Sequence, residues 1–162
     1  GLTFHQIFII NQKGWTMDML GSSYVFLGIF SIIGLIFGGP IIDKHNTKKI
    51  ILFALLPLFL GVLTLIFFDS YYSMLVYMSL LGLNLGISPS FIGSLWAELY
   101  GLESLGSVKA LLHACSVFAS ALSPVIFGYI IDAGFGIIAI SVISLTIIIV
   151  STLLPIFYKH IE

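Results

Sequence analysis

Five long apolar runs constrain this chain more than any other feature of its sequence. Each is close in length to the about 20 residues that a helix needs to cross a bilayer. The runs cover residues 19–42, 50–68, 71–97, 108–131 and 137–158. Hydrophobic residues make up 59% of the 162 residues and charged residues 8%, whereas an average soluble domain is about half apolar and about a quarter charged. The chain is therefore predicted to be an all-α membrane protein with lipid over most of its surface.

A sixth apolar segment, residues 1–11, is too short to cross a bilayer alone. It ends in a polar stretch that contains Lys13 and Trp15, and tryptophan is common at membrane interfaces. The segment is interpreted as the end of a truncated first helix, so that the chain is expected to be a fragment with five complete transmembrane helices. The first residue is Gly rather than Met, which agrees with this expectation.

The lysines predict which side of the membrane each loop faces. Five of the six occur at loops or helix ends on one predicted side, namely Lys44, Lys48, Lys49, Lys109 and Lys159. The opposite side holds only Lys13, together with Asp18, Asp69 and Asp132. Because lysine is retained in short cytoplasmic loops, we expect the C-terminus to be cytoplasmic. The predicted location is the plasma (inner) membrane.

The basic loop after the first long run has a recognisable spacing. Gly39 is followed after three residues by Asp43-Lys44, and Lys48-Lys49 complete the basic stretch. This arrangement resembles the loop that marks each half of transporters of the major facilitator superfamily. Asn46 stands where that family usually has glycine, and asparagine also tolerates a left-handed backbone.

A second segment strengthens the resemblance. Residues 95–101 and 105–110 are similar to the loop between the fourth and fifth helices of a transporter half, as found in bacterial members grouped with monocarboxylate and oxalate/formate carriers. Further similarity occurs at residues 4–6, 14–15, 120–124 and 128–134. The resemblance covers nearly the whole chain, in the order of the C-terminal six helices.

The resemblance implies half of a twelve-helix bundle, whose partner is the N-terminal six-helix half of the same transporter. A solute would bind between the halves and gain alternating access as they rock. The resemblance also implies a conformational-gating loop, with Glu98 and Lys109 belonging to the same charge network. The residues assigned to it are Gly39, Asp43, Lys44, Glu98 and Lys109. The implied substrate is a small carboxylate, although the spans hold no central Arg or Lys to pair with one.

Polar residues inside the apolar runs are the candidates for substrate binding, because such residues are rare in lipid-facing helices. They are His5, Gln6, Asn84, Ser88, His113, Ser116 and Ser120. A hydroxyl that bonds to its own helix is the alternative for each serine. A structural hydrogen bond is the alternative for His113, and simple solvation is the alternative for His5. Either histidine could titrate near neutral pH and couple transport to protons.

Other classes of function find little support. We find no Ser-His-Asp spacing, no Cys/His metal cluster and no phosphate-binding loop, so neither an enzyme nor a cofactor or metal site is predicted. A net charge of −1 does not suggest nucleic acid as a partner. The single cysteine, Cys115, is expected to be a small buried apolar side chain. Two alternatives stay open: the same fold carrying a neutral solute or drug, and a multi-pass membrane protein without a transport role.

Overall fold

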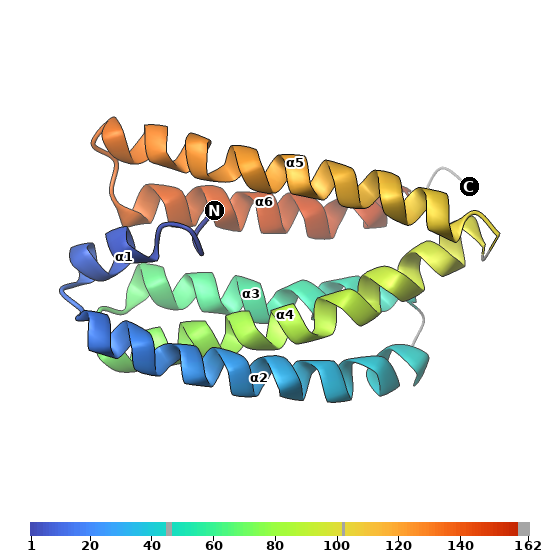
Figure 1. The fold of residues 1–162 in the computed structure, drawn as a ribbon, viewed down its shortest axis with the longest axis horizontal. Coiled ribbons are helices and arrows are strands. Elements are labelled where there is room, and N and C mark those ends of the chain that lie inside the picture. The colour runs from blue at the N-terminus through green and yellow to red at the C-terminus, as the bar shows by residue number, and fades with distance from the viewer. Residues whose placement is uncertain (45–46, 102, 159–162) are drawn as a thin grey trace.

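The computed structural model describes the backbone of residues 1–44, 47–101 and 103–158, and the side chains of residues 1–41, 54–98, 100–101 and 103–153. Its described part is built from helices, with no strand (Figure 1). The helices are α1 (Gln6–Lys13), α2 (Met17–Lys44), α3 (Thr47–Phe67), α4 (Tyr71–Tyr100), α5 (Leu105–Asp132) and α6 (Ile137–Tyr158). The all-α prediction is therefore confirmed.

Several helices have the length and composition of membrane spans. Met17–Ile41, Tyr71–Glu98 and Leu105–Asp132 are each long and apolar enough to cross a bilayer. Within the described side chains, α3 and α6 contribute shorter apolar stretches, Ala54–Phe67 and Ile137–Leu153. Prolines lie inside α2, α3, α4 and α5, as is tolerated where neighbouring helices and local adjustments satisfy the freed backbone groups.

The helix ends follow from local chemistry. Ser70 precedes α4, and its hydroxyl oxygen accepts a hydrogen bond from the backbone N–H of Tyr72 at 3.3 Å. Gly14 ends α1 in a left-handed conformation with φ 68°. At the opposite end of the bundle, two helices extend beyond their apolar stretches. The stretch in α2 ends at Ile41 but the helix continues to Lys44, and the stretch in α4 ends at Glu98 but the helix continues to Tyr100.

The closest helix pair is α2 with α4, and glycines make the approach possible. A Cβ atom at Gly82 would collide with the carbonyl oxygen of Leu27, and one at Gly86 with the carbonyl oxygen of Ser31. Two backbones can approach this closely in a membrane only where small residues line the interface. Gly82 and Gly86 therefore form the surface of α4 that contacts α2.

The buried core lies mainly at one end of the bundle. We call this the α1 end; it holds α1 and the turns at residues 14–16, 68–70 and 133–136 (left in Figure 1). Its fully buried apolar side chains include Ile10, Val62, Leu65, Met74, Met78 and Ile140. The opposite end, where α2 and α4 finish and α5 begins, has a separate small cluster around Ala54 and Phe91. We call it the lysine end.

Candidate functional site

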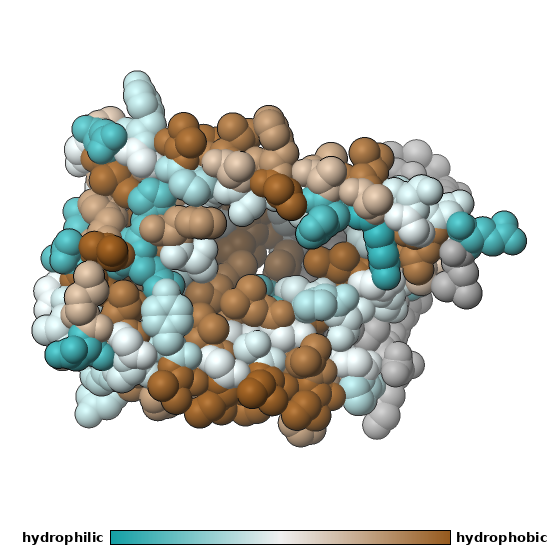
Figure 2. All heavy atoms as spheres, in the orientation of Figure 1, coloured by the Kyte–Doolittle hydropathy of each residue, from teal (hydrophilic) through white to brown (hydrophobic). Residues whose placement is uncertain are grey.

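A cavity of about 490 Å³ lies between α4 and α5, toward the lysine end. The face of the bundle shown in Figure 2 is hollowed between α5 and the layer formed by α2 and α4. The residues lining the cavity are Pro89, Ile92, Gly93 and Trp96 from α4, and Lys109, Leu112, His113 and Ser116 from α5. A cavity with a few convergent polar groups on apolar walls is typical of a small-molecule site.

The polar groups of the cavity come from one face of α5. Lys109, His113 and Ser116 are spaced by four and three residues, which places them on the same side of a helix. Opposite them, Gly93 leaves room for the lysine, whose Nζ lies 3.9 Å from the position a Cβ atom would take. The set of lining residues contains no carboxylate. The cavity therefore offers a cation, an imidazole and a hydroxyl, with the indole of Trp96 beside them.

Two of the predicted serines hydrogen-bond to their own helices. Ser116 donates to the carbonyl oxygen of His113 at 3.0 Å, and Ser88 donates to that of Asn84 at 2.7 Å. Each hydroxyl oxygen can still accept a hydrogen bond. Ser120 is exposed on α5 and does not line the cavity. Asn84 is buried, and its side chain donates to the carbonyl oxygen of Ala54 in α3 at 2.7 Å, which joins α4 to α3.

His5 and Gln6 lie at the α1 end, away from the cavity. The His5 ring packs against Phe127 of α5, with ring centroids 6.0 Å apart. Gln6 is buried and accepts a hydrogen bond from the hydroxyl of Tyr24 at 2.6 Å. Tyr24 was not predicted as a site residue, because a tyrosine near the start of an apolar run, here residues 19–42, normally indicates the membrane interface. Of the seven predicted site residues, His113 and Ser116 line the cavity and His5 and Gln6 lie together at the α1 end, whereas Asn84, Ser88 and Ser120 belong to neither group.

The predicted gating residues also separate. Glu98 belongs to the last turn of α4 and is exposed, while Lys109 belongs to the second turn of α5 and lines the cavity. Gly39 has open space where a Cβ atom would lie. Asp43 and Lys44 continue the backbone of α2, but their side chains lie outside the described residues, as does Asn46 entirely. Within the described side chains, the one ion pair joins Lys13 to Asp69, not Glu98 to Lys109.

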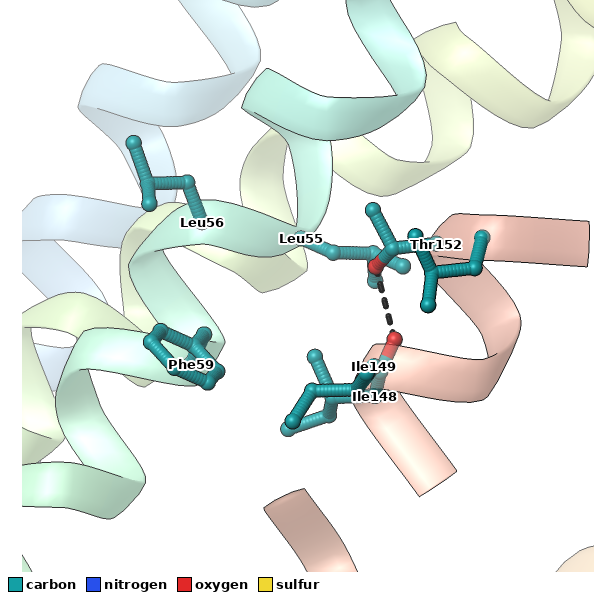
Figure 3. A pocket seen from close by; sticks show the side chains of 7 residues that line it. Leu55, Leu56, Phe59, Ile148, Ile149 and Thr152 are labelled. Atoms are coloured by element: carbon teal, nitrogen blue, oxygen red, sulfur yellow. Dashed lines mark hydrogen bonds between the residues drawn. The ribbon is translucent and has the colours of Figure 1, made fainter. Parts of the chain in front are cut away.

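A second cavity, of about 200 Å³, lies between α3 and α6 and is almost wholly apolar. Its lining includes Leu55, Leu56 and Phe59 of α3 and Ile148, Ile149 and Thr152 of α6, and Figure 3 shows Leu55 extending toward Thr152. The hydroxyl of Thr152 donates to the carbonyl oxygen of Ile148 at 2.6 Å. Because the Thr152 hydroxyl is already hydrogen-bonded and the other lining residues are apolar, this cavity is poorly suited to a polar solute.

The described residues contain no group of three His, Cys, Asp or Glu side chains that could hold a metal ion. Cys115 lies on the exposed surface of α5, so the expectation that it is buried is wrong. The physical reason is that α5 makes few contacts with the rest of the bundle and buries only Phe127.

Comparison with known proteins decides the family. A sequence model of the Major Facilitator Superfamily matches residues 1–162, which is the whole chain. The chain belongs to the major facilitator superfamily. This membership and the apolar helices make it a multi-pass membrane protein.

One curated relative of this superfamily member is the D-xylose transporter of Levilactobacillus brevis. The two are 28% identical over 102 residues, which are 63% of this chain and 21% of that protein. The chain thus spans about a fifth of the length of that relative. No solved structure matches the chain. The similarity to monocarboxylate and oxalate/formate carriers has no counterpart in these comparisons.

Proposed function

We propose that the protein containing this chain is a secondary active transporter that moves a small organic solute across the membrane by alternating access. The cavity between α4 and α5 is the observation that supports this function most directly. The α5 residues of the cavity run from Lys109 to Ser116, about 6 to 16 Å along the helix from Leu105 at about 1.5 Å per residue. The cavity thus extends from the lysine end toward the middle of a hydrocarbon core about 30 Å thick, where transporters of this kind bind their solutes.

A small carboxylate is the substrate class that the cavity chemistry favours. Lys109 supplies a positive charge, and no lining residue supplies a negative one. His113 and Ser116 add groups that can hydrogen-bond a carboxylate oxygen. A charge-assisted hydrogen bond between an ammonium and a carboxylate is roughly twice as strong as a neutral one, so Lys109 is expected to dominate the affinity.

A neutral solute, such as a sugar, is the second candidate. It is favoured by the relative named a D-xylose transporter. The indole of Trp96 offers an apolar face, and the paired Gln6 and Tyr24 offer uncharged hydrogen-bonding groups at the α1 end. For such a substrate, Lys109 would contribute little to binding.

The partner of this chain in transport is proposed to be the N-terminal six-helix half of the same transporter. The outer faces of α2 and α5 suit such a partner, because they are apolar and exposed. Their exposed side chains include Val25, Ile29, Ile32, Ile36, Leu111, Val117, Phe118 and Val125. We place the lysine end and the C-terminus in the cytoplasm of a cell whose plasma (inner) membrane holds the protein. The residues proposed to act in gating there are Gly39, Asp43, Lys44, Glu98 and Lys109.

Uptake by the reconstituted transporter tests this function. The full-length gene product that includes residues 1–162 would be inserted into proteoliposomes and given labelled formate, oxalate, lactate and D-xylose under a proton gradient. Saturable uptake of a carboxylate, competed by other carboxylates and not by D-xylose, is the expected result. Competition by D-xylose alone would select the neutral-solute alternative. A correctly inserted protein that takes up none of the panel would favour a membrane protein without a transport role.

A further inference from the structure

The cavity between α4 and α5 has two walls of different chemistry. Its charged and strongly polar side chains, a lysine, a histidine and a serine, all belong to α5. The α4 wall is apolar except for the indole N–H of its tryptophan. The residues of that wall share one helical face, at three- and four-residue spacing, and are Pro89, Ile92, Gly93 and Trp96. A ligand that fills the cavity therefore needs one polar side and one apolar side.

The Lys109 ammonium reaches across the cavity to the α4 wall. Its Nζ atom lies 3.9 Å from the position that a Cβ atom would take at Gly93, so the missing side chain leaves room for the cation there. A carboxylate bound to this ammonium would therefore lie beside Gly93. A charge-assisted hydrogen bond is stronger than a neutral one, so this contact would fix one end of an anionic ligand against α4.

Trp96 lies one helical turn from Gly93 and lines the same cavity. Residues three apart on a helix have Cβ atoms about 5–6 Å apart, so the indole stands close to the place where the carboxylate would bind. The ring of Tyr100 packs against the indole, with ring centroids 5.9 Å apart and 41° between the ring planes. Tyr100 itself is not among the lining residues, so it supports the indole without taking up ligand space.

The size and the apolar wall of the cavity narrow the class of ligand. A volume of about 490 Å³ is in the range of sites whose ligands carry a ring or a similar apolar body. Formate or lactate bound to Lys109 would leave most of the α4 wall without a contact. A sugar would place hydroxyl groups against that wall, where only the Trp96 N–H can form a hydrogen bond, and a buried hydroxyl without a partner weakens binding.

We propose that the solute is an aromatic monocarboxylate of about the size of benzoate, whose carboxylate binds Lys109 and whose ring stacks on Trp96. This inference rests on the transport function proposed above and narrows its substrate class. Aromatic rings gain a specific contact with one another in addition to the burial of apolar area. Trp96 therefore determines specificity, because it distinguishes an aromatic ring from a saturated ring of similar size.

Uptake kinetics of three acids test this assignment. Labelled benzoate, cyclohexanecarboxylate and lactate are given to the full-length transporter in proteoliposomes, and the lowest KM is expected for benzoate. Trp96→Leu is expected to raise the KM for benzoate about tenfold, because it removes the ring contact and part of the apolar wall, and to change the KM for lactate less than about twofold. The preference for benzoate over cyclohexanecarboxylate should disappear in the same variant.

Two further variants control for a structural effect at Trp96. Trp96→Phe keeps an aromatic ring and should keep most of the affinity for benzoate. Tyr72→Leu changes an exposed ring near the start of the same helix, far from the cavity lining, and should leave all three KM values unchanged. A rise of the same size for all three acids in Trp96→Leu, or a lower KM for lactate than for benzoate in the unmodified transporter, would overturn the proposal.

Equilibrium binding of labelled benzoate to the purified full-length protein separates this inference from the transport function. Binding that is weakened by both Lys109→Met and Trp96→Leu is expected. The same binding in a protein that takes up none of the acids would reject the transport function and retain the proposed ligand class. Uptake of lactate by a protein that does not bind benzoate would retain the transport function and overturn the aromatic substrate.

Discussion

α4 meets its two neighbours in opposite ways. Against α2 it packs backbone to backbone, and Gly82 and Gly86 leave no space for a side chain. Against α5 it stands across a cavity, and Gly93 faces only the end of the flexible Lys109 side chain. The same residue type therefore allows close helix packing on one side of α4 and leaves open space beside a cavity on the other. Glycines in a membrane helix have to be interpreted from what they face.

The largest expected effect comes from adding a single methyl group on the packed side. Gly86→Ala is expected to destabilise the protein by about 1–3 kcal/mol, because the new Cβ atom collides with the backbone of α2. Gly93→Ala, whose Cβ atom would meet nothing closer than the Lys109 Nζ atom at 3.9 Å, is the matched control and should be close to neutral. Thermal unfolding in detergent measures both. Equal stability of the two variants would contradict the difference between close packing on the α2 side of α4 and open space on its α5 side.

The next effect concerns the charge in the cavity. Lys109→Met is expected to raise the KM for carboxylate uptake about tenfold or more, since it removes a hydrogen bond to a charged group worth about 1.5–3 kcal/mol. Lys109→Arg keeps the charge and should retain most of the affinity. Uptake kinetics in proteoliposomes measure the KM of both variants. An unchanged KM in Lys109→Met would indicate that this lysine is a charge at the membrane interface that does not bind the substrate. That result would favour a neutral substrate.

A smaller effect is expected at the contact between α4 and α3. Asn84→Ala removes the hydrogen bond to the Ala54 carbonyl, and interhelical hydrogen bonds in membranes contribute about 0.6 kcal/mol on average. The unfolding temperature should fall slightly while the KM for uptake stays the same. If instead the KM changed at constant stability, Asn84 would contact the solute, as the sequence suggested.

The smallest effect is expected at the serines. Ser88→Ala and Ser116→Ala each remove a hydroxyl that donates to the carbonyl of its own helix, so uptake should change by less than about twofold. Side-by-side uptake curves for the two variants test this. A selective loss in Ser116→Ala would show that its oxygen accepts a hydrogen bond from the substrate, because Ser116 lines the cavity and Ser88 does not.

The fold class could be predicted because it depends on composition and on the length of the apolar runs. Gly82 and Gly86 lie four residues apart, a spacing of small residues that is typical of close helix contacts in membranes. The contacts of Lys13 with Phe68 and of Gln12 with Ile137 could not be predicted, because they join residues 55 and 125 positions apart and no local sequence pattern specifies such contacts. Lys109 was assigned to the gating network from the family resemblance, and its position in the cavity lining was not predicted, because a lysine near a loop normally indicates topology.

The weak attachment of α5 has a consequence for how ligand preference could be changed. This helix supplies one side chain to the buried core, Phe127, and four of the eight residues around the cavity. Substitutions on its cavity face are therefore expected to change the chemistry of the proposed binding cavity at little cost to folding. In a mutant library designed to bind new solutes, most members are expected to fold if the substitutions are confined to Leu112, His113 and Ser116. If the same number of substitutions were made on the side of α4 that contacts α2, most members are expected to misfold.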